Sequence, residues 1–235
     1  MTVPGPLLGD VLRLGDDPQM KEWGADVLDE RPVAAIGDVS GAVYDLVRAS
    51  LGNRPRIHPS AYVSPLANVA EDVVVGPGAK VHEFSTVRGR TVISADVHIG
   101  YGCEISRCAV GQGSVLSHRA TIGCAVIGRR AYFAAGLMIA VCVLSNPDML
   151  HPTKTISFAL PGGGRMSTGQ SKWGALVGDG VRAGVRVTLS PGAVVGANAV
   201  LGGGVTVPTA WIPPGATVHQ SSTTHITPAD GAPSP

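Results

Sequence analysis

Residues 57–105 read IHPSAYVSPLANVAEDVVVGPGAKVHEFSTVRGRTVISADVHIGYGCEI, and this stretch decides the fold. Every sixth residue in it is valine or isoleucine: Ile57, Val63, Val69, Val75, Val81, Val87, Ile93, Ile99 and Ile105. Four positions after each comes a small or β-branched residue: Ala61, Ala67, Val73, Ala79, Ser85, Thr91, Val97, Cys103 and Ala109. A period of six is neither the 3.6 of a helix nor simple alternation. It predicts a short strand and a tight turn, repeated along the chain.

The repeat continues beyond this stretch with two slips of register. The first slip falls at Val110 and the second at Ile127, and after an interruption the period returns at Val177. The later positions of the repeat are Leu116, Ile122, Phe133, Ile139, Ala183, Leu189, Val195, Leu201 and Val207. Three hexads would close one triangular coil of roughly 18 residues, with about seven coils between Ile57 and Ile212. The sequence therefore predicts an all-β fold, a parallel β-helix of hexapeptide repeats.

Three segments lie outside the repeat. Residues 1–54 contain the helical spacing Val39, Val43, Leu46, Val47 and Leu51, and we expect this segment to cap the open end of the coils. The β-helix itself should span residues 55–218, with residues 145–172 forming one long protruding loop. Loops of this length in compact domains are commonly functional. Residues 219–235 should be a flexible tail.

Composition narrows the class of protein. The chain has 235 residues, a net charge of +1 and 44% hydrophobic residues, which argues against a disordered chain. Without a run of Lys or Arg, we expect no nucleic-acid partner. The first residues carry acids where a signal peptide needs a basic region, and no apolar run reaches the roughly 18–20 residues of a membrane span. We therefore expect a cytoplasmic protein without a membrane partner.

The cysteines and histidines give no metal-binding pattern. Cys103, Cys108, Cys124 and Cys142 include no CxxC pair, and we expect them to be reduced, packed thiols. The histidines His58, His82, His98 and His151 have no paired spacing either. The sequence therefore predicts that no metal is bound.

His118 is the one histidine in a suggestive place, just beyond the first slip. A slip in a regular solenoid re-aims the side chains at a corner. Histidine has a reference pKa of about 6.5, so it could take a proton from an incoming amine or hydroxyl at neutral pH. The alternative is a histidine that only occupies a surface turn, and on the residues alone that alternative is the stronger.

Several motifs resemble a known family. They are Cys103-Glu104-Ile105-Ser106, then Ser114-Val115-Leu116-Ser117-His118 with Ile122-Gly123, and Thr168-Gly169-Gln170-Ser171-Lys172-Trp173-Gly174-Ala175. They resemble the C-terminal acetyltransferase domain of the bifunctional glucosamine-1-phosphate acetyltransferase/uridylyltransferases. The resemblance is closest to the archaeal-type and short nucleotidyltransferase-like branch. It implies a left-handed β-helix and a homotrimer in which the loop 145–172 reaches a neighbouring subunit.

The resemblance also implies roles for residues. His118 would be the base that deprotonates the amino group of the acceptor, and Glu104 would be its supporting carboxylate. Arg107 and Thr121 would bind the small-molecule acceptor, and Lys172 would contact phosphate or cofactor. Cys142 and Ala183, together with Lys172, would contact acetyl-CoA or another acyl-CoA, the co-substrate.

The chain departs from the family pattern at three places. The family lysine after the glutamate is Ser106, its tyrosine after the histidine is Thr121, and its polar Asn-Tyr segment is Val141-Cys142-Val143. Three hypotheses follow. The first is an acyl-CoA-dependent N- or O-acyltransferase acting on an amino-sugar or sugar-phosphate-like acceptor. The second is an inactive family member that serves as a structural or regulatory trimer. The third is a binding or transfer protein with altered chemistry, with a non-sugar acceptor in a specialised biosynthetic pathway.

Overall fold

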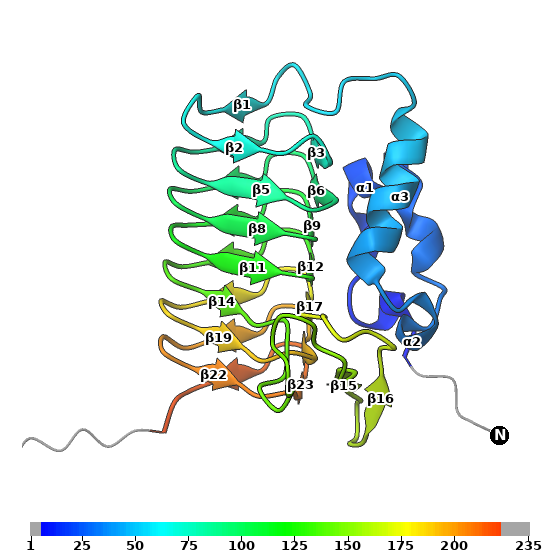
Figure 1. The fold of residues 1–235 in the computed structure, drawn as a ribbon, viewed down its shortest axis with the longest axis vertical. Helices are drawn as coiled ribbons and strands as arrows, with labels where there is room; N and C mark the ends of the chain where they lie inside the picture. Colours follow the sequence, from blue (N-terminus) through cyan, green and yellow to red (C-terminus); the bar gives the residue numbers. More distant parts are fainter. Residues whose placement is uncertain (1–5, 222–235) are drawn as a thin grey trace, which may run out of the picture.

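The computed structural model describes residues 6–221, so most of the predicted tail 219–235 lies outside the described residues. Its core is a stack of coils, each of which adds one short strand to each of three parallel sheets (Figure 1). One of these sheets has seven strands, the last of which contains Ile212. An isolated bridge between Ile57 and Val75 adds one more pairing at the start of that sheet. The predicted parallel β-helix is thus confirmed, and it is consistent with the left-handed form.

The three sheets are named here by the order in which the chain enters them. Sheet I contains β1 (Tyr62–Val63), β4 (Lys80–Val81), β7 (His98–Ile99), β10 (Val115–Leu116), β13 (Tyr132–Phe133), β18 (Arg182–Ala183), β21 (Val200–Leu201) and β24 (Thr217–Val218). Sheet II contains β2 (Asn68–Val69), β5 (Thr86–Arg88), β8 (Glu104–Ser106), β11 (Thr121–Gly123), β14 (Met138–Ile139), β19 (Thr188–Leu189) and β22 (Thr206–Val207). Sheet III contains β3 (Val73–Val75), β6 (Thr91–Ile93), β9 (Ala109–Val110), β12 (Val126–Ile127), β17 (Ala175–Val177), β20 (Ala193–Val195) and β23 (Trp211–Ile212).

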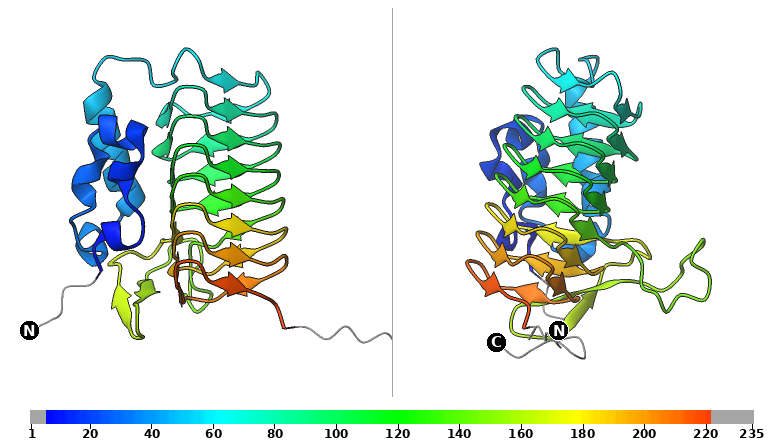
Figure 2. Two further views of the ribbon diagram at one scale, coloured as in Figure 1. Left: turned by 180° about the vertical axis from the view of Figure 1, so that it is seen from behind. Right: turned by 90° about the vertical axis from the view of Figure 1, so that its left-hand side faces the viewer.

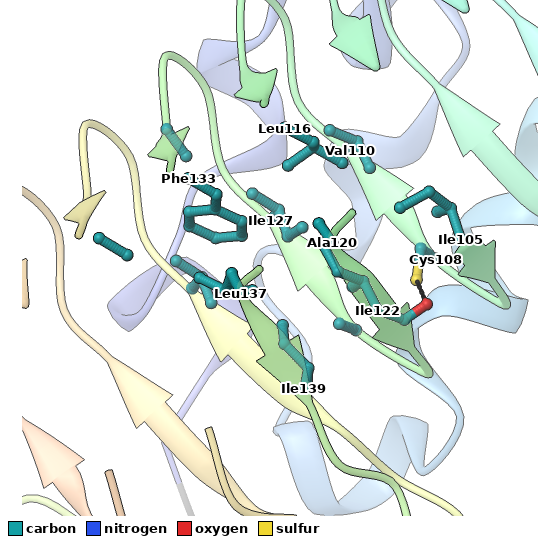
Figure 3. Packing of buried hydrophobic residues seen from close by; sticks show 14 of the residues in the cluster. Ile105, Cys108, Val110, Leu116, Ala120, Ile122, Ile127, Phe133, Leu137 and Ile139 are labelled. Atoms are coloured by element: carbon teal, nitrogen blue, oxygen red, sulfur yellow. Dashed lines mark hydrogen bonds between the residues drawn. The ribbon is translucent and has the colours of Figure 1, made fainter. Parts of the chain in front are cut away.

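The branched residues of the hexad point into the prism and stack in register. Ile105 pairs with Ile122, and Ile122 pairs with Ile139, along sheet II. Phe133, the largest of these inward side chains, is 1% exposed (Figure 3). Burial of such side chains is the main free-energy gain of each coil, and no coil could achieve it alone.

Both register slips fall at the corner between sheets II and III. Ile93 pairs with Val110, and Val110 with Ile127, so the stacking is preserved although each of these coils is one residue shorter. The shortened corners turn on Arg107 and Cys124, whose φ angles are 55° and 48°. The left-handed region is costly for side chains other than glycine. These two shortened corners lie on adjacent coils, because Ser106 pairs with Gly123 and Val110 pairs with Ile127.

The N-terminal segment differs from the prediction. Its helices are η1 (Leu8–Asp10), η2 (Leu14–Asp16), α1 (Pro18–Glu22), η3 (Ala25–Leu28), α2 (Val33–Ile36) and α3 (Val39–Leu51). The predicted helix is present as α3, with Val39, Val43, Val47 and Leu51 buried. The segment does not cap the end of the coils, however, but lies along the outer face of sheet III (Figures 1 and 2). The reason is that the outward residues of this sheet are themselves apolar: Val74, Val92, Ala109, Val126, Leu176 and Val194.

One buried carboxylate ties this helical segment to the coils. Asp17 is 2% exposed and accepts hydrogen bonds from the Gln112 amide at 2.7 Å and from the Ser94 hydroxyl at 3.1 Å. It also caps α1 by accepting from the amides of Gln19 and Met20. A buried carboxylate with this many donors is fully satisfied, and it fixes the position of the segment.

The long insertion lies between β14 and β17 and contains a hairpin that the sequence did not predict. The strands β15 (Ser157–Ala159) and β16 (Arg165–Ser167) pair antiparallel. Phe158 stacks on Trp173 with ring centroids 5.9 Å apart, and the Trp173 indole N–H donates to the Gly37 carbonyl at 3.1 Å. This part therefore packs on the lower half of sheet III, whereas the stretch before it projects away from the coils (Figure 2, right).

Candidate functional site

A groove of about 440 Å³ lies over sheet II, next to the two shortened corners. Four residues that the family resemblance singles out line it: Glu104 of β8, Arg107 in the next turn, Thr121 of β11 and Lys172 shortly before β17. Glu104 pairs with Thr121 in the sheet, so these two exposed side chains are direct neighbours on its outer face. The structure thus brings together residues that are far apart in the sequence.

The charges of the groove are unevenly matched. Glu104 accepts a hydrogen bond from Arg88 at 2.7 Å, and Arg107 donates to Asp38, beside the start of α3, at 3.2 Å. Lys172 is exposed and has no ion-pair partner within residues 6–221. An anionic ligand entering the groove would therefore meet an uncompensated ammonium.

The backbone holds Lys172 at the edge of the groove. The amide of Trp173 donates to the Val141 carbonyl at 3.0 Å, and the amide of Gly174 donates to the Cys124 carbonyl at 2.9 Å. A Cβ at Gly174 would lie 2.1 Å from the Gly123 carbonyl oxygen, so only glycine permits this close approach. The end of the insertion is thus fastened directly to the second shortened corner.

Two of the four cysteines lie at this corner. Cys124 lines the groove, and burial raises the pKa of its thiol, an effect that nearby Arg107 and Lys172 partly oppose. Cys142 is half-buried and directly follows Val141, another lining residue. All four cysteines are free thiols, as expected.

His118 does not lie in this groove. It is exposed in the turn between β10 and β11 and lines a second hollow of about 360 Å³ over sheet I, together with His82, His98 and Tyr132. Its Nδ1 accepts a hydrogen bond from the Tyr101 amide at 3.2 Å. In the neutral imidazole this arrangement leaves the proton on Nε2. Within one chain, Glu104 bonds to Arg88 and not to His118.

The predicted cofactor contacts are scattered. Ala183 of β18 is 2% exposed, and its methyl group belongs to the core, so only its backbone could meet a ligand. Cys142 lies beside the sheet II groove and Lys172 in it. The roles assigned to His118, Cys142 and Ala183, and those assigned to the residues of the sheet II groove, stay predictions.

Sequence reasoning missed three lining residues, Arg88, Met138 and Ala140. These residues could have been found from the order in which equivalent positions stack on one another along sheet II. Arg88, Ser106 and Gly123 occupy the same position in successive coils, and so do Glu104, Thr121 and Met138. Reading the outward positions coil by coil would have placed all of them on one surface.

No helix in residues 6–221 is both long and apolar enough to span a bilayer. Among the same residues, no cluster of His, Cys, Asp and Glu side chains has the arrangement needed to hold a metal ion.

Comparison with known proteins supports the resemblance seen in the motifs. No family model matches the chain. A bifunctional protein GlmU from Methylococcus capsulatus is 30% identical over 170 residues, which cover 68% of this chain and 32% of that protein. A bifunctional sugar-1-phosphate nucleotidylyltransferase/acetyltransferase from Sulfurisphaera tokodaii is 31% identical over 115 residues, 49% of this chain and 27% of that protein. The chain thus spans about a third or less of the length of these relatives.

Among solved structures, the polysialic acid O-acetyltransferase OatWY aligns with a TM-score of 0.45 and 20% identity, over 73% of this chain and 90% of that chain. The fold assignment rests on the strand pairing of the chain itself. The relatives confirm the resemblance that the motifs around Glu104, His118 and Lys172 indicate. The chain is a hexapeptide-repeat protein related in sequence to a part of the GlmU-type bifunctional proteins.

Proposed function

We propose that the chain is an acyltransferase that moves an acyl group, such as acetyl, from coenzyme A to the nitrogen or oxygen of a small sugar-like acceptor in the cytoplasm. The observation that carries the proposal is the groove over sheet II, where Glu104, Arg107, Thr121 and Lys172 converge from three separate segments. Glu104 and Lys172 belong to the family motifs, Thr121 stands where the family has a tyrosine, and the relatives named above include an acetyltransferase. An exposed ammonium suits a phosphate of the acceptor or of coenzyme A.

The reaction would need few protein groups. The acceptor amine or hydroxyl attacks the thioester carbonyl, the carbon–sulfur bond breaks, and coenzyme A leaves as its thiol. The proton lost by the acceptor passes to a base, a role that the resemblance gives to His118, and from the base to the departing sulfur. For this role His118 must release the Tyr101 amide from Nδ1, the nitrogen whose lone pair takes the proton.

We further propose a homotrimer. Large exposed side chains gather on sheet I and on its corner with sheet II: Tyr62, Phe84, Tyr101 and Tyr132, each 46–59% exposed. Phe84 and Tyr101 form an edge-to-face pair with centroids 5.5 Å apart. An apolar surface of this kind typically marks contact with a partner. Packing of this surface against another copy could carry His118 toward the groove of that copy.

Assembly and site sharing can be measured together. Light scattering should give about three times 23.9 kDa, and a stable monomer at micromolar concentration would contradict the trimer. If sites are shared, mixing His118→Ala and Lys172→Ala chains after mild dissociation should restore part of the activity that each variant lacks at subsaturating ligand concentrations. Recovery would be absent if each chain holds a complete site.

The chemistry is tested by following release of the coenzyme A thiol from acetyl-CoA in the presence of amino-sugar phosphates. His118→Ala should lower turnover by about 10²–10⁴-fold, the usual cost of losing acid–base catalysis. Its affinity for acetyl-CoA should stay unchanged, because the base touches the acceptor. Full activity of His118→Ala would remove the proposed base, and absence of both turnover and acyl-CoA binding would favour a structural or regulatory protein.

A further inference from the structure

The outward side chains of sheet II change from polar to apolar within the groove. At the first outward position, successive strands carry Asn68, Thr86, Glu104, Thr121, Met138, Thr188 and Thr206, which pair in register. Met138 is the only apolar residue of this row, and it is 48% exposed. An exposed methionine between threonines has no packing reason within the chain, so it supplies an apolar contact surface to whatever occupies the groove.

The outward position two residues further along each strand of sheet II also becomes apolar at the coil of Met138. Arg88, Ser106 and Gly123 pair in register, and the next coil continues with Ala140 and Val141. A Cβ added at Gly123 would lie 2.6 Å from a methyl carbon of Val141, so the valine side chain lies over the glycine. Met138, Ala140 and Val141 therefore form a continuous apolar wall along one side of the groove.

The opposite side of the groove is charged. Arg88, Glu104 and Arg107 lie on the preceding coils. Lys172, which has no ion-pair partner in the described chain, stands at the edge beside Val141, because the amide of the next residue, Trp173, donates to the Val141 carbonyl. The groove thus offers cations to one part of a ligand and methyl groups to another. A ligand that fits both parts is anionic at one end and apolar at the other.

We propose that the acceptor is a deoxyamino sugar linked to a phosphate, whose deoxygenated, methyl-bearing face lies against Met138, Ala140 and Val141. This inference rests on the acyltransferase function proposed above. The hydroxyl of a hydroxymethyl group against this wall would lose its bonds to water and find no protein partner. A methyl group at the same place has no such cost, and an apolar pocket discriminates against an added hydroxyl by about 100-fold.

The test uses two acceptors that differ by one oxygen, glucosamine 1-phosphate and its 6-deoxy analogue, with acetyl-CoA as donor. We expect kcat/KM to favour the 6-deoxy acceptor by about 10–100-fold. The double variant Met138→Gln with Val141→Asn should abolish or reverse that preference. Thr206→Asn, on the same sheet far from the groove, should keep it. Met138 is exposed, so Met138→Gln alone serves as a second variant if the double variant melts early.

The outcomes separate the inference from the proposed function. Turnover with equal kcat/KM for the two acceptors would overturn the inference and leave the acyltransferase function standing. If kcat/KM depends on the chain length of the acyl-CoA and not on the acceptor, the apolar wall contacts the acyl group. That result would also overturn the inference. If no transfer occurs, calorimetric Kd values for the two phosphates still decide: tighter binding of the 6-deoxy compound supports the inference, and equal Kd values overturn it.

Discussion

Sheets II and III are built by the same repeat, yet the outer face of sheet III is covered and that of sheet II is exposed. In both sheets the inward residues are branched and almost fully buried, as in Ile105 and Ile127. The outward residues of sheet III are apolar and lie under the helical segment, whereas those of sheet II are mostly polar and exposed around the groove. The inward half of the hexad therefore specifies the solenoid, and the outward half specifies what each face binds.

The largest effect that separates the two faces should come from one new charge. Val92→Asp places a carboxylate under α3, where the residue is fully buried, and should cost about 3–5 kcal/mol of the free energy of unfolding. Thr206→Asp, outward on sheet II and exposed, should change it by no more than about 0.5 kcal/mol. Urea unfolding followed by circular dichroism measures both. Equal costs would contradict the assignment of a covered and an open face.

A smaller effect should come from the anchor of the helical segment. Asp17→Ala leaves the Gln112 amide and the Ser94 hydroxyl without their acceptor and should cost about 2–3 kcal/mol. Glu71→Ala removes an exposed ion pair with Arg56 and should cost less than about 1 kcal/mol. Proteolysis within residues 6–54 should accelerate in the Asp17 variant alone. Unchanged cleavage would mean that apolar contacts alone hold the segment on sheet III.

The inward positions of the coils could be predicted from the sequence, whereas the contacts of the outward positions could not. The six-residue period fixes the inward positions, and through them the coils, because every inward side chain meets the same environment. The outward apolar residues of sheet III recur only once per coil, as Val92, Ala109 and Val126 do, and a six-residue period does not reveal them. The position of α3 along sheet III therefore could not be derived from the spacing of its own residues. The hairpin β15–β16 was missed for a related reason: Phe158 and Trp173 pack on the segment around Gly37, a contact between distant parts of the chain.

The candidate site was predicted in part. Glu104, Arg107, Thr121 and Lys172 were named from motifs, and the two shortened corners bring them together. His118 was named from the same motifs but lies over sheet I, since the turn before β11 points to that side. Met138 escaped notice because an exposed methionine matches no motif and can be recognised only once its neighbours in the sheet are known.

A third contrast is between thiols. Burial raises the pKa of Cys108 to about 12, so at pH 8 its thiolate fraction should be on the order of 10⁻⁴. Cys142 is half-buried beside the groove. Iodoacetamide at pH 8 should therefore label Cys142 in the native protein and Cys108 only after denaturation, as peptide mass mapping would reveal. Similar labelling rates would show that the core opens readily at this corner.

The raised pKa of Cys108 also sets a dependence of stability on pH. The folded state holds the thiol proton more tightly than the unfolded state, so this contribution is complete below pH of about 9. It should decline as the pH rises through the folded pKa of about 12. Cys108→Ala should flatten the decline measured by urea unfolding between these values, and an unchanged slope would contradict the burial effect.

The proposed function depends on ligand binding in the groove over sheet II, and two lysines test that binding most directly. Lys172 borders the groove, whereas Lys80 is also exposed but lies on sheet I. Isothermal titration with acetyl-CoA and with glucosamine 1-phosphate should show that Lys172→Ala weakens binding of at least one ligand by about 10–100-fold, the cost of losing a charged contact. Lys80→Ala should bind both as the unmodified chain does. Equal affinities of the Lys172→Ala and unmodified chains for both ligands would contradict the account.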